Sequence, residues 1–318
     1  TKAWVDIIPE GDGVIDRVSH FGGQLFVEQM VDATSRLYRY DYEGNQLDAI
    51  ELPGLGSLGA LRGKHDSSLV YYSCSSFNYP GAIFRLDTCR GESSIYRIPD
   101  TPFVPDDYSV EQVFYASKDG TEVPMFIVHR TDLDRSKPHP VYLYGYGGFN
   151  VSLTPFFSIS NAVWMDHGGI FALPNLRGGG EYGKEWHHAG TIHRKQNVFD
   201  DFIAAAEYLV DAGITEPGML GSGGGSNGGL LTAATMLQRP NLFGAVYSSV
   251  GVHDMLRYHE FTIGSAWATD YGTSADAEEF KTLIAYSPVH NVRSDVDYPP
   301  ILLATSDHDD RVVPAHTY

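Results

Sequence analysis

The stretch Gly224-Gly225-Ser226-Asn227-Gly228 decides the fold class of this 318-residue chain. It matches the pattern G-x-S-x-G, in which a serine occupies a sharp turn between a strand and a helix. Glycines suit this turn because its backbone is strained and the side chains around it must be small. Residues 230–238 supply the helix that must follow, and Pro240 ends it. The pattern therefore predicts a serine hydroxyl that stands clear of a sheet, beside the Asn227 backbone N–H and the positive end of a helix dipole.

The sequence on both sides of this turn indicates an α/β fold. Helical periodicity over 199–210 ends at Gly213, and short apolar runs predict buried strands. The expected strands are 141–144, 170–173, 245–250 and 301–305, preceded by a hairpin of 112–117 and 123–129. Strands that alternate with helices argue for a parallel sheet. Directly before the serine, Gly221-Ser222-Gly223 are poor strand formers, so we expect the strand that carries Ser226 to be short or weakly held.

The first hundred residues follow a different pattern. The segment Leu37-Tyr38-Arg39-Tyr40-Asp41 precedes Leu52-Pro53, and 46 residues later Ile83-Phe84-Arg85-Leu86-Asp87 precedes Ile98-Pro99. A repeat of roughly 40–50 residues built from short strands is typical of β-propeller blades, although chance alternation also produces two copies. Two blades cannot close a ring, so a propeller implies further sequence. We expect the last blades of a propeller over 1–107 and an α/β domain over 108–318.

A carboxylate is expected after the strand 301–305. Open α/β sheets place functional groups at the C-terminal ends of their strands, and Asp307, Asp309 and Asp310 all follow this strand. In folds with this serine turn, the chain order is nucleophile, acid, histidine. Only His316 follows the acid, too close along the chain to belong to a separate loop, so we expect it to be a surface histidine. The histidine base is then expected to lie beyond the end of this chain.

Four longer motifs carry a resemblance to a known family. They are Tyr144-Gly145-Tyr146-Gly147-Gly148-Phe149-Asn150, Asn175-Leu176-Arg177-Gly178-Gly179-Gly180-Glu181-Tyr182-Gly183, Gly224-Gly225-Ser226-Asn227-Gly228-Gly229 and Asp307-His308-Asp309-Asp310-Arg311-Val312-Val313-Pro314. These motifs resemble the prolyl oligopeptidase family, and the resemblance extends weakly through the preceding residues from Trp4. It implies a propeller that caps an α/β-hydrolase domain, truncated here before the catalytic histidine. It also implies a serine endopeptidase that cleaves short peptides on the carboxyl side of proline through an acyl-enzyme.

The resemblance also implies a role for individual residues. Ser226 is the expected nucleophile, Asp309 the acid of the triad, and Arg311 the cation that holds a carbonyl of the substrate. The Tyr146 hydroxyl and the Asn227 backbone N–H are the expected donors to the oxyanion. The proline ring of the substrate is expected to lie in an apolar pocket built from Trp267, Phe149, Val252, Tyr271 and Val312.

Composition narrows the possible partners. The chain has 22 Lys and Arg against 40 Asp and Glu, a formal net charge of −18, which argues against nucleic acid or an anionic membrane surface as a partner. Two cysteines, Cys74 and Cys89, do not make a disulfide framework, so we expect a cytoplasmic protein. We expect short peptides as substrates, a monomer when complete, and neither a metal nor another cofactor.

Two other functions remain open at the level of sequence. The same fold serves oligopeptidases with basic specificity and esterases, although the apolar pocket implied here suits proline better. Alternatively, the propeller is a non-catalytic interaction module and the second domain its scaffold. Because the triad lacks its histidine, we expect the chain by itself to be inactive.

Overall fold

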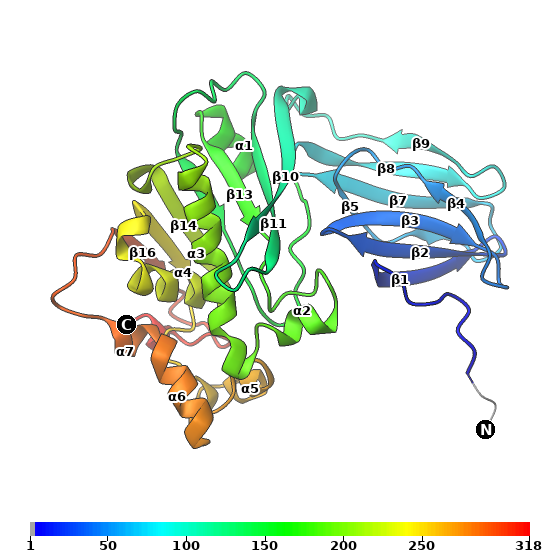
Figure 1. Ribbon diagram of the computed structural model, residues 1–318. Helices are drawn as coiled ribbons and strands as arrows, with labels where there is room; N and C mark the ends of the chain where they lie inside the picture. Colours follow the sequence, from blue (N-terminus) through cyan, green and yellow to red (C-terminus); the bar gives the residue numbers. More distant parts are fainter. Residues whose placement is uncertain (1–3) are drawn as a thin grey trace. The chain divides into compact units, whose positions relative to one another are not determined.

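The computed structural model describes residues 4–318 (Figure 1). The chain divides into two compact units, and each has its own hydrophobic core. The first unit runs up to Val110 and includes Thr154–Ala162; the second comprises Glu111–Leu153 and Val163–Tyr318. Every residue to which the sequence assigns a role in the site falls in the second unit.

The first unit consists of two antiparallel sheets. One has the order β1-β2-β3-β4, with strands at Val14–Phe21, Gln24–Val31, Thr34–Tyr40 and Gln46–Ile50. The other has the order β5-β7-β8-β9, with β6 also paired to β7; its strands are Ser57–Leu58, Arg62–Gly63, Leu69–Ser76, Tyr79–Asp87 and Glu92–Arg97. Each sheet is a short antiparallel ribbon of the kind that forms a propeller blade.

The sequence repeat corresponds to equivalent strands of the two sheets. Its first copy falls on β3 and its second on β8, each the third strand of its sheet. Leu37 of β3 and alternate residues of β8, such as Phe84, enter one shared core. The 46-residue spacing therefore reflects a repeated structural unit and not chance alternation. Cys74 and Cys89 are both free thiols, the first buried in this unit and the second exposed.

The second unit is built on a seven-stranded sheet of order β10-β11-β13-β12-β14-β15-β16. The strands are Tyr108–Ala116, Glu122–Arg130, Ile170–Pro174, Val141–Tyr144, Leu220–Gly225, Ala245–Ser249 and Ile301–Ala304, in that spatial order. β11 is antiparallel to β13, and the strands from β13 to β16 are mutually parallel. The predicted α/β class, with the predicted hairpin at the sheet's edge, is confirmed.

Helices connect the parallel strands. The α-helices are α1 (Ile159–Asp166), α2 (Lys184–His188), α3 (Gln196–Asp211), α4 (Asn227–Gln238), α5 (Ala268–Tyr271), α6 (Ala277–Tyr286) and α7 (Pro288–Asn291). Short 3-10 helices are η1 (Pro105–Asp107), η2 (Ile192–Arg194), η3 (Pro217–Met219), η4 (Pro240–Leu242), η5 (Tyr258–Glu260), η6 (Gly264–Trp267) and η7 (Pro314–His316). α3 and α4 contact each other, and α4 packs on β14 and β15 (Figure 1).

The strand that carries the serine is longer and better paired than its composition predicts. β14 has six residues, pairs with β12 on one side and with β15 on the other, and lies inside the sheet. Its glycines are required by close packing. A Cβ on Gly223 would collide with the Tyr142 ring, and a Cβ on Gly224 would collide with backbone of Gly145 and Gly228. The expectation of a short or weakly held strand is therefore wrong. The glycines are present because neighbouring groups occupy the space that side chains would need, and they do not indicate weak pairing.

The close packing of the serine turn gives a prediction about stability. A Cβ on Gly228, in the first turn of α4, would lie 2.5 Å from the Gly145 carbonyl oxygen, whereas a Cβ on Gly221 would be 3.6 Å from its nearest neighbour. We expect Gly228→Ala to destabilise the second unit by about 1–3 kcal/mol, the usual cost of overpacking. The matched control, Gly221→Ala, should leave its denaturant midpoint nearly unchanged. Equal midpoints for both variants would show that the turn tolerates side chains.

Candidate functional site

Ser226 occupies a strained turn between β14 and α4. Its backbone has φ 58° and ψ −118°, a region that residues with side chains rarely adopt. The turn is held by its own hydrogen bonds: the Ser226 N–H donates to the Ser249 carbonyl (2.9 Å), and the Ser226 carbonyl accepts the N–H groups of Gly229 (2.9 Å) and Leu230 (3.1 Å). Ser226 is half-buried, so its hydroxyl lies at the end of the sheet and not in the core.

Two hydrogen-bond donors adjoin this serine. Tyr146 follows β12, the neighbour of β14 in the sheet, and its phenol is close enough to the Ser226 side chain for that side chain to lower the pKa of the phenol. Asn227 is the first residue of α4, so its N–H has no acceptor one turn earlier in the helix. The structure thus brings together Ser226, Tyr146 and Asn227, with a phenol and a backbone amide available to a negative oxygen.

The Tyr146 phenol remains protonated at neutral pH. Burial raises its pKa above the ordinary value, and the Asp270 carboxylate adds to the increase. The polar side chain of Ser226 and the positive charge of Arg311 oppose this shift. Because a raised pKa favours the neutral phenol, Tyr146 is a hydrogen-bond donor throughout the physiological range. The electrostatic effect of Arg311 also places that exposed guanidinium in the vicinity of the phenol.

A buried cluster of polar side chains lies beneath the Tyr146 loop. Lys195 is only 1% exposed, and its ammonium donates to the Gly147 carbonyl (2.9 Å) and to Asn227 Oδ1 (3.1 Å). Asn227 Oδ1 also accepts the Tyr271 hydroxyl (2.9 Å), while Asn227 Nδ2 donates to the Tyr146 carbonyl. The Asn227 side chain therefore fixes the backbone of the loop that carries the phenol.

Asp270 supplies the negative charge of this cluster. It is 2% exposed and lies 3.7 Å from Lys195 Nζ, and its Oδ1 is 2.7 Å from His187 Nε2. Both carboxylate oxygens accept the Phe149 N–H, at 3.2 and 3.3 Å. Phe149 has φ 56°, a left-handed conformation that costs a residue with a side chain roughly 1–2 kcal/mol. Asp270 thus stabilises a strained residue of the same loop.

Burial also changes the acidity of the lysine. It lowers the pKa of Lys195 to about 8, and the Asp270 carboxylate opposes this shift. At pH 7 the side chain is below this pKa and carries its charge. The ammonium has three N–H donors, and Gly147, Asn227 and Asp270 surround it. Within residues 4–318, the arrangement is a paired buried charge and not an isolated one.

Asp309 follows β16 and is oriented by its own loop. Its Oδ1 accepts the N–H groups of Arg311 and Val312, each at 2.9 Å. Among the described residues no partner is present for Oδ2. Asp307, an alternative acid by position, is exposed and lies 3.0 Å from the His308 ring nitrogen. The structure shows no contact between Asp309 and Ser226, so the part of Asp309 in a triad stays a prediction.

No histidine of residues 4–318 forms a hydrogen bond with Ser226 or Asp309. His316, expected at the surface, is instead 3% exposed, which corrects that prediction. Its Nδ1 accepts the Asp254 N–H (3.1 Å), and its ring packs edge-on against Phe261. Burial lowers the pKa of His316 to about 4. A short helix after β16 turns this residue inward, so it has a structural role and is not the base.

The predicted pocket residues belong to one aromatic and aliphatic cluster. Phe149 packs edge-on against Tyr271 (5.3 Å between centroids), and Tyr258 packs against Tyr271 and stacks parallel to Trp267 (6.3 Å). Phe149 and Trp267 are partly exposed. The remaining predicted members are nearly fully buried: Val252 1%, Tyr271 1% and Val312 2%. Phe149 and Trp267 therefore present most of the accessible ring surface, and the buried residues support them.

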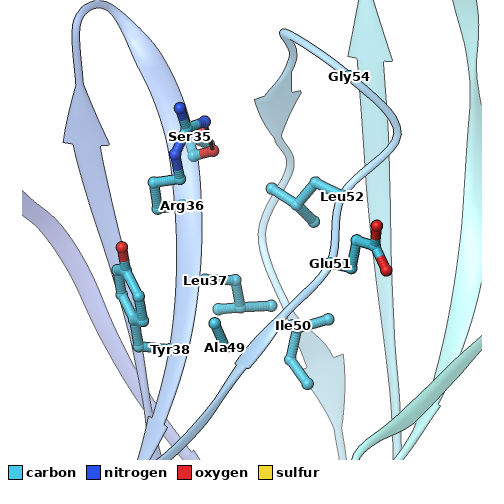
Figure 2. Close-up of a pocket in the computed structure, with 9 residues that line it drawn as sticks. All are labelled: Ser35, Arg36, Leu37, Tyr38, Ala49, Ile50, Glu51, Leu52 and Gly54. Carbon is cyan, nitrogen blue, oxygen red and sulfur yellow. Dashed lines mark hydrogen bonds between the residues drawn. The ribbon is translucent and has the colours of Figure 1, made fainter.

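The first unit contains a hollow that offers no comparable chemistry. A cavity of about 340 Å³ lies beside β3 and β4, and Figure 2 shows the residues that line it. Its lining includes Ser35 and Arg36, but both have partners: the Ser35 hydroxyl contacts Glu28 and accepts the Leu58 N–H, and Arg36 donates to Thr34.

Within residues 4–318, no group of three His, Cys, Asp or Glu side chains is arranged to hold a metal ion. None of the helices in the same range has the length and apolar character needed to cross a membrane.

The fold and the site together define a class. A serine on a strand-to-helix turn, next to donors from its own helix and from the loop after a neighbouring parallel strand, is the arrangement of serine hydrolases of the α/β-hydrolase fold. The first unit adds the antiparallel blades of a propeller.

Comparison with known proteins specifies the family. Residues 155–318 match the prolyl oligopeptidase family, and residues 1–99 match the N-terminal β-propeller domain of prolyl oligopeptidase. The prolyl endopeptidase of Elizabethkingia miricola is 48% identical over 318 residues, which is 100% of this chain and 45% of the relative. A structure from a study of two prolyl endopeptidases superposes with a TM-score of 0.94 and 51% identity, over 98% of this chain and 46% of that one. The structure of prolyl oligopeptidase B of Galerina marginata, bound to a 35mer hydrolysis and macrocyclization substrate, superposes with a TM-score of 0.94 and 38% identity. The match covers 98% of this chain and 45% of that one.

The chain belongs to the prolyl oligopeptidase family. It spans about 45% of the length of the relatives that it matches. The expected combination of propeller blades and an α/β-hydrolase domain is confirmed.

Reasoning from the sequence missed several members of the site. Lys195 follows His193 and Arg194, and such a run of cations is typical of a solvated face. Nothing local distinguishes it. Asp270 lies between Trp267 and Tyr271, both implied by the resemblance, so an acid within an aromatic run was a usable signal. Tyr258 and His187 have no comparable signal.

The geometry around Ser226 predicts a specific kinetic effect of the phenol. In the full-length protein, Tyr146→Phe should lower kcat by about 10²–10³-fold, because one oxyanion donor is worth roughly that much in the transition state. KM should change much less, since the hydroxyl meets full negative charge only after attack. Steady-state kinetics on a peptide substrate measure both constants. An unchanged kcat in this variant would show that Tyr146 does not donate to the oxyanion.

Proposed function

We propose that the full-length protein is a serine endopeptidase that cleaves short peptides on the carboxyl side of proline. The observation that carries this proposal is the juxtaposition of the Ser226 hydroxyl, the Tyr146 phenol and the N-terminus of α4. The family membership and the name prolyl endopeptidase of the relatives support it.

In the proposed mechanism, the Ser226 oxygen attacks the scissile carbonyl and forms an acyl-enzyme. The carbonyl oxygen becomes negative in the tetrahedral intermediate, where the Tyr146 hydroxyl and the Asn227 N–H donate to it. Both donors are preorganised, because the backbone of each is held by hydrogen bonds before substrate binds. The serine proton must pass to a base. Since no histidine in residues 4–318 contacts Ser226, we propose that the base comes from another part of the polypeptide.

Specificity for proline is proposed to rest on the accessible rings of Phe149 and Trp267. Proline presents a compact apolar ring and no N–H, so aromatic surface suits it better than polar or charged groups do. Asp270, the buried acid that binds the Phe149 N–H, is already engaged by Lys195 and His187. It is therefore a poor partner for the cationic side chain of a basic substrate. We propose that Arg311, exposed near the phenol, holds a carbonyl of the peptide backbone.

Replacement of the partly exposed ring tests this specificity. Trp267→Ala should lower kcat/KM for a proline peptide by about 10-fold, through lost ring contact and lost burial. The same peptide with alanine at that position should lose less than about 3-fold, since it makes little ring contact. Trp267→Phe keeps an aromatic face and serves as the matched control. Equal losses on both peptides would exclude Trp267 from the proline pocket.

A fluorophosphonate probe and a reporter peptide test the reaction itself. The full-length protein should be labelled at Ser226 and should release the reporter after proline, whereas Ser226→Ala should do neither. Absence of labelling in a folded full-length protein would instead support a non-catalytic interaction module. Labelling together with cleavage only after Arg or Lys would retain the hydrolase and refute the proline specificity. Cytoplasmic location and a monomeric state stay predictions from the sequence.

A further inference from the structure

Lys195 and Asp270 lie where three parts of the proposed site meet. Asp270 belongs to α5, the helix that follows Trp267 and ends at Tyr271. Lys195 directly precedes α3 and reaches the serine turn through Asn227 Oδ1. Both residues also bind the loop that begins with Tyr146. One buried ion pair therefore connects three segments: the turn at Ser226, the loop that begins with Tyr146, and α5, which follows Trp267.

The loop after β12 has few bonds of its own in this region. Gly147 has φ 62° and Phe149 has φ 56°, so the chain takes left-handed conformations on either side of Gly148. Its backbone groups instead form hydrogen bonds with buried side chains of other elements. The Tyr146 carbonyl accepts Asn227 Nδ2, the Gly147 carbonyl accepts Lys195 Nζ, and the Phe149 N–H donates to Asp270. Removal of the ammonium would free the Gly147 carbonyl and leave the buried Asp270 carboxylate without its lysine partner, held only by His187 and the Phe149 N–H.

Resting on the proposed function, we propose that Lys195, paired with Asp270, is a positioning residue that holds the Tyr146 hydroxyl where it donates to the oxyanion. Lys195 contacts neither substrate nor reacting atoms in this role. It acts through the backbone of Tyr146 and Gly147 and through the Asn227 side chain. The fixed loop is what makes the phenol preorganised, and preorganisation is the property that makes such donors effective.

Other groups facing the ammonium are consistent with a charged, fixed lysine. The Tyr271 ring lies 5.2 Å from Nζ, and its hydroxyl donates to the same Asn227 oxygen. His187, on α2, binds the opposite partner, Asp270. Burial lowers the pKa of Lys195 to about 8, so assays at pH 7 examine the charged form.

A double-mutant cycle in the full-length protein tests the proposal. Lys195→Met removes the charge and the donors but retains the length of the side chain. It should lower kcat by about 10–100-fold, part of what one oxyanion donor supplies. In a Tyr146→Phe background the same change should cost less than about 3-fold, because the hydroxyl that Lys195 positions is already absent. Losses of equal size in the two backgrounds would overturn the proposal.

Two controls separate positioning from general damage. Lys118→Met removes a lysine whose side chain is 76% exposed and should leave kcat unchanged in both backgrounds. Leu209→Ala creates a cavity on the buried face of α3, and its effect on kcat should be the same with and without the Tyr146 hydroxyl. If Lys195→Met does not fold, the cycle is carried out with Asp270→Asn, which keeps the shape. The expected coupling and the contradicting result are unchanged.

The cycle remains informative if the proline specificity is wrong. An activated ester such as p-nitrophenyl acetate also passes through an oxyanion at Ser226 and needs no proline pocket. Wild-type protein that hydrolyses the ester but not the proline peptide would refute the proposed substrate alone. Coupling between Lys195 and Tyr146 measured on the ester would then still support positioning, and its absence would still refute it.

Discussion

The backbone conformation of Ser226 is the constraint on which the rest of the site depends. A residue with a side chain at φ 58° and ψ −118° costs of order 1–3 kcal/mol, so surrounding structure must hold it there. β14 fixes one side through ladders with two neighbours, and α4 fixes the other through its first hydrogen bonds. The hydroxyl is thereby placed at the C-terminal edge of the sheet, where the loops that follow the adjacent parallel strands begin.

This placement explains the glycines that surround the turn. The backbone of the turn approaches Gly145 so closely that a side chain at Gly224 or Gly228 would collide with that carbonyl. The same proximity brings the Tyr146 phenol to the serine. Close approach of two backbones therefore does more than close a tight turn, because it aligns a donor from one strand with a nucleophile from the next.

Beneath this contact lies a buried ion pair, which a protein core tolerates only when its members are well paired. Lys195 and Asp270 meet that condition by binding backbone groups of the oxyanion loop as well as each other. Their mutual attraction and their hydrogen bonds to the loop offset the cost of burying two charges, and the same bonds order the loop. The Tyr271 ring lies against Lys195, and Tyr258 packs on Tyr271 and stacks on Trp267, which links the pair to the surface on which we propose that proline binds.

Sequence patterns predicted the elements of this structure better than their connections. The strand at Val141–Tyr144 and the helix around 199–210 follow from apolar periodicity, which burial on one or both faces imposes. The full pairing of β14 could not be predicted from the sequence. Its glycines are required by close contacts with neighbouring groups, and composition alone does not reveal those contacts. Lys195 was missed for the same reason: its burial depends on residues about 30 to 75 positions away. Ser226 was identifiable because a turn of this kind is specified locally.

A crystal structure of the full-length protein with a peptide aldehyde that ends in proline would show where the oxyanion of the tetrahedral intermediate lies. The aldehyde should form a hemiacetal with the Ser226 oxygen and so mimic the tetrahedral intermediate. The hemiacetal oxygen should lie about 2.7–3.1 Å from both the Tyr146 hydroxyl and the Asn227 backbone nitrogen. An adduct whose oxygen points away from both donors, or an aldehyde that does not bond to Ser226, would contradict this prediction.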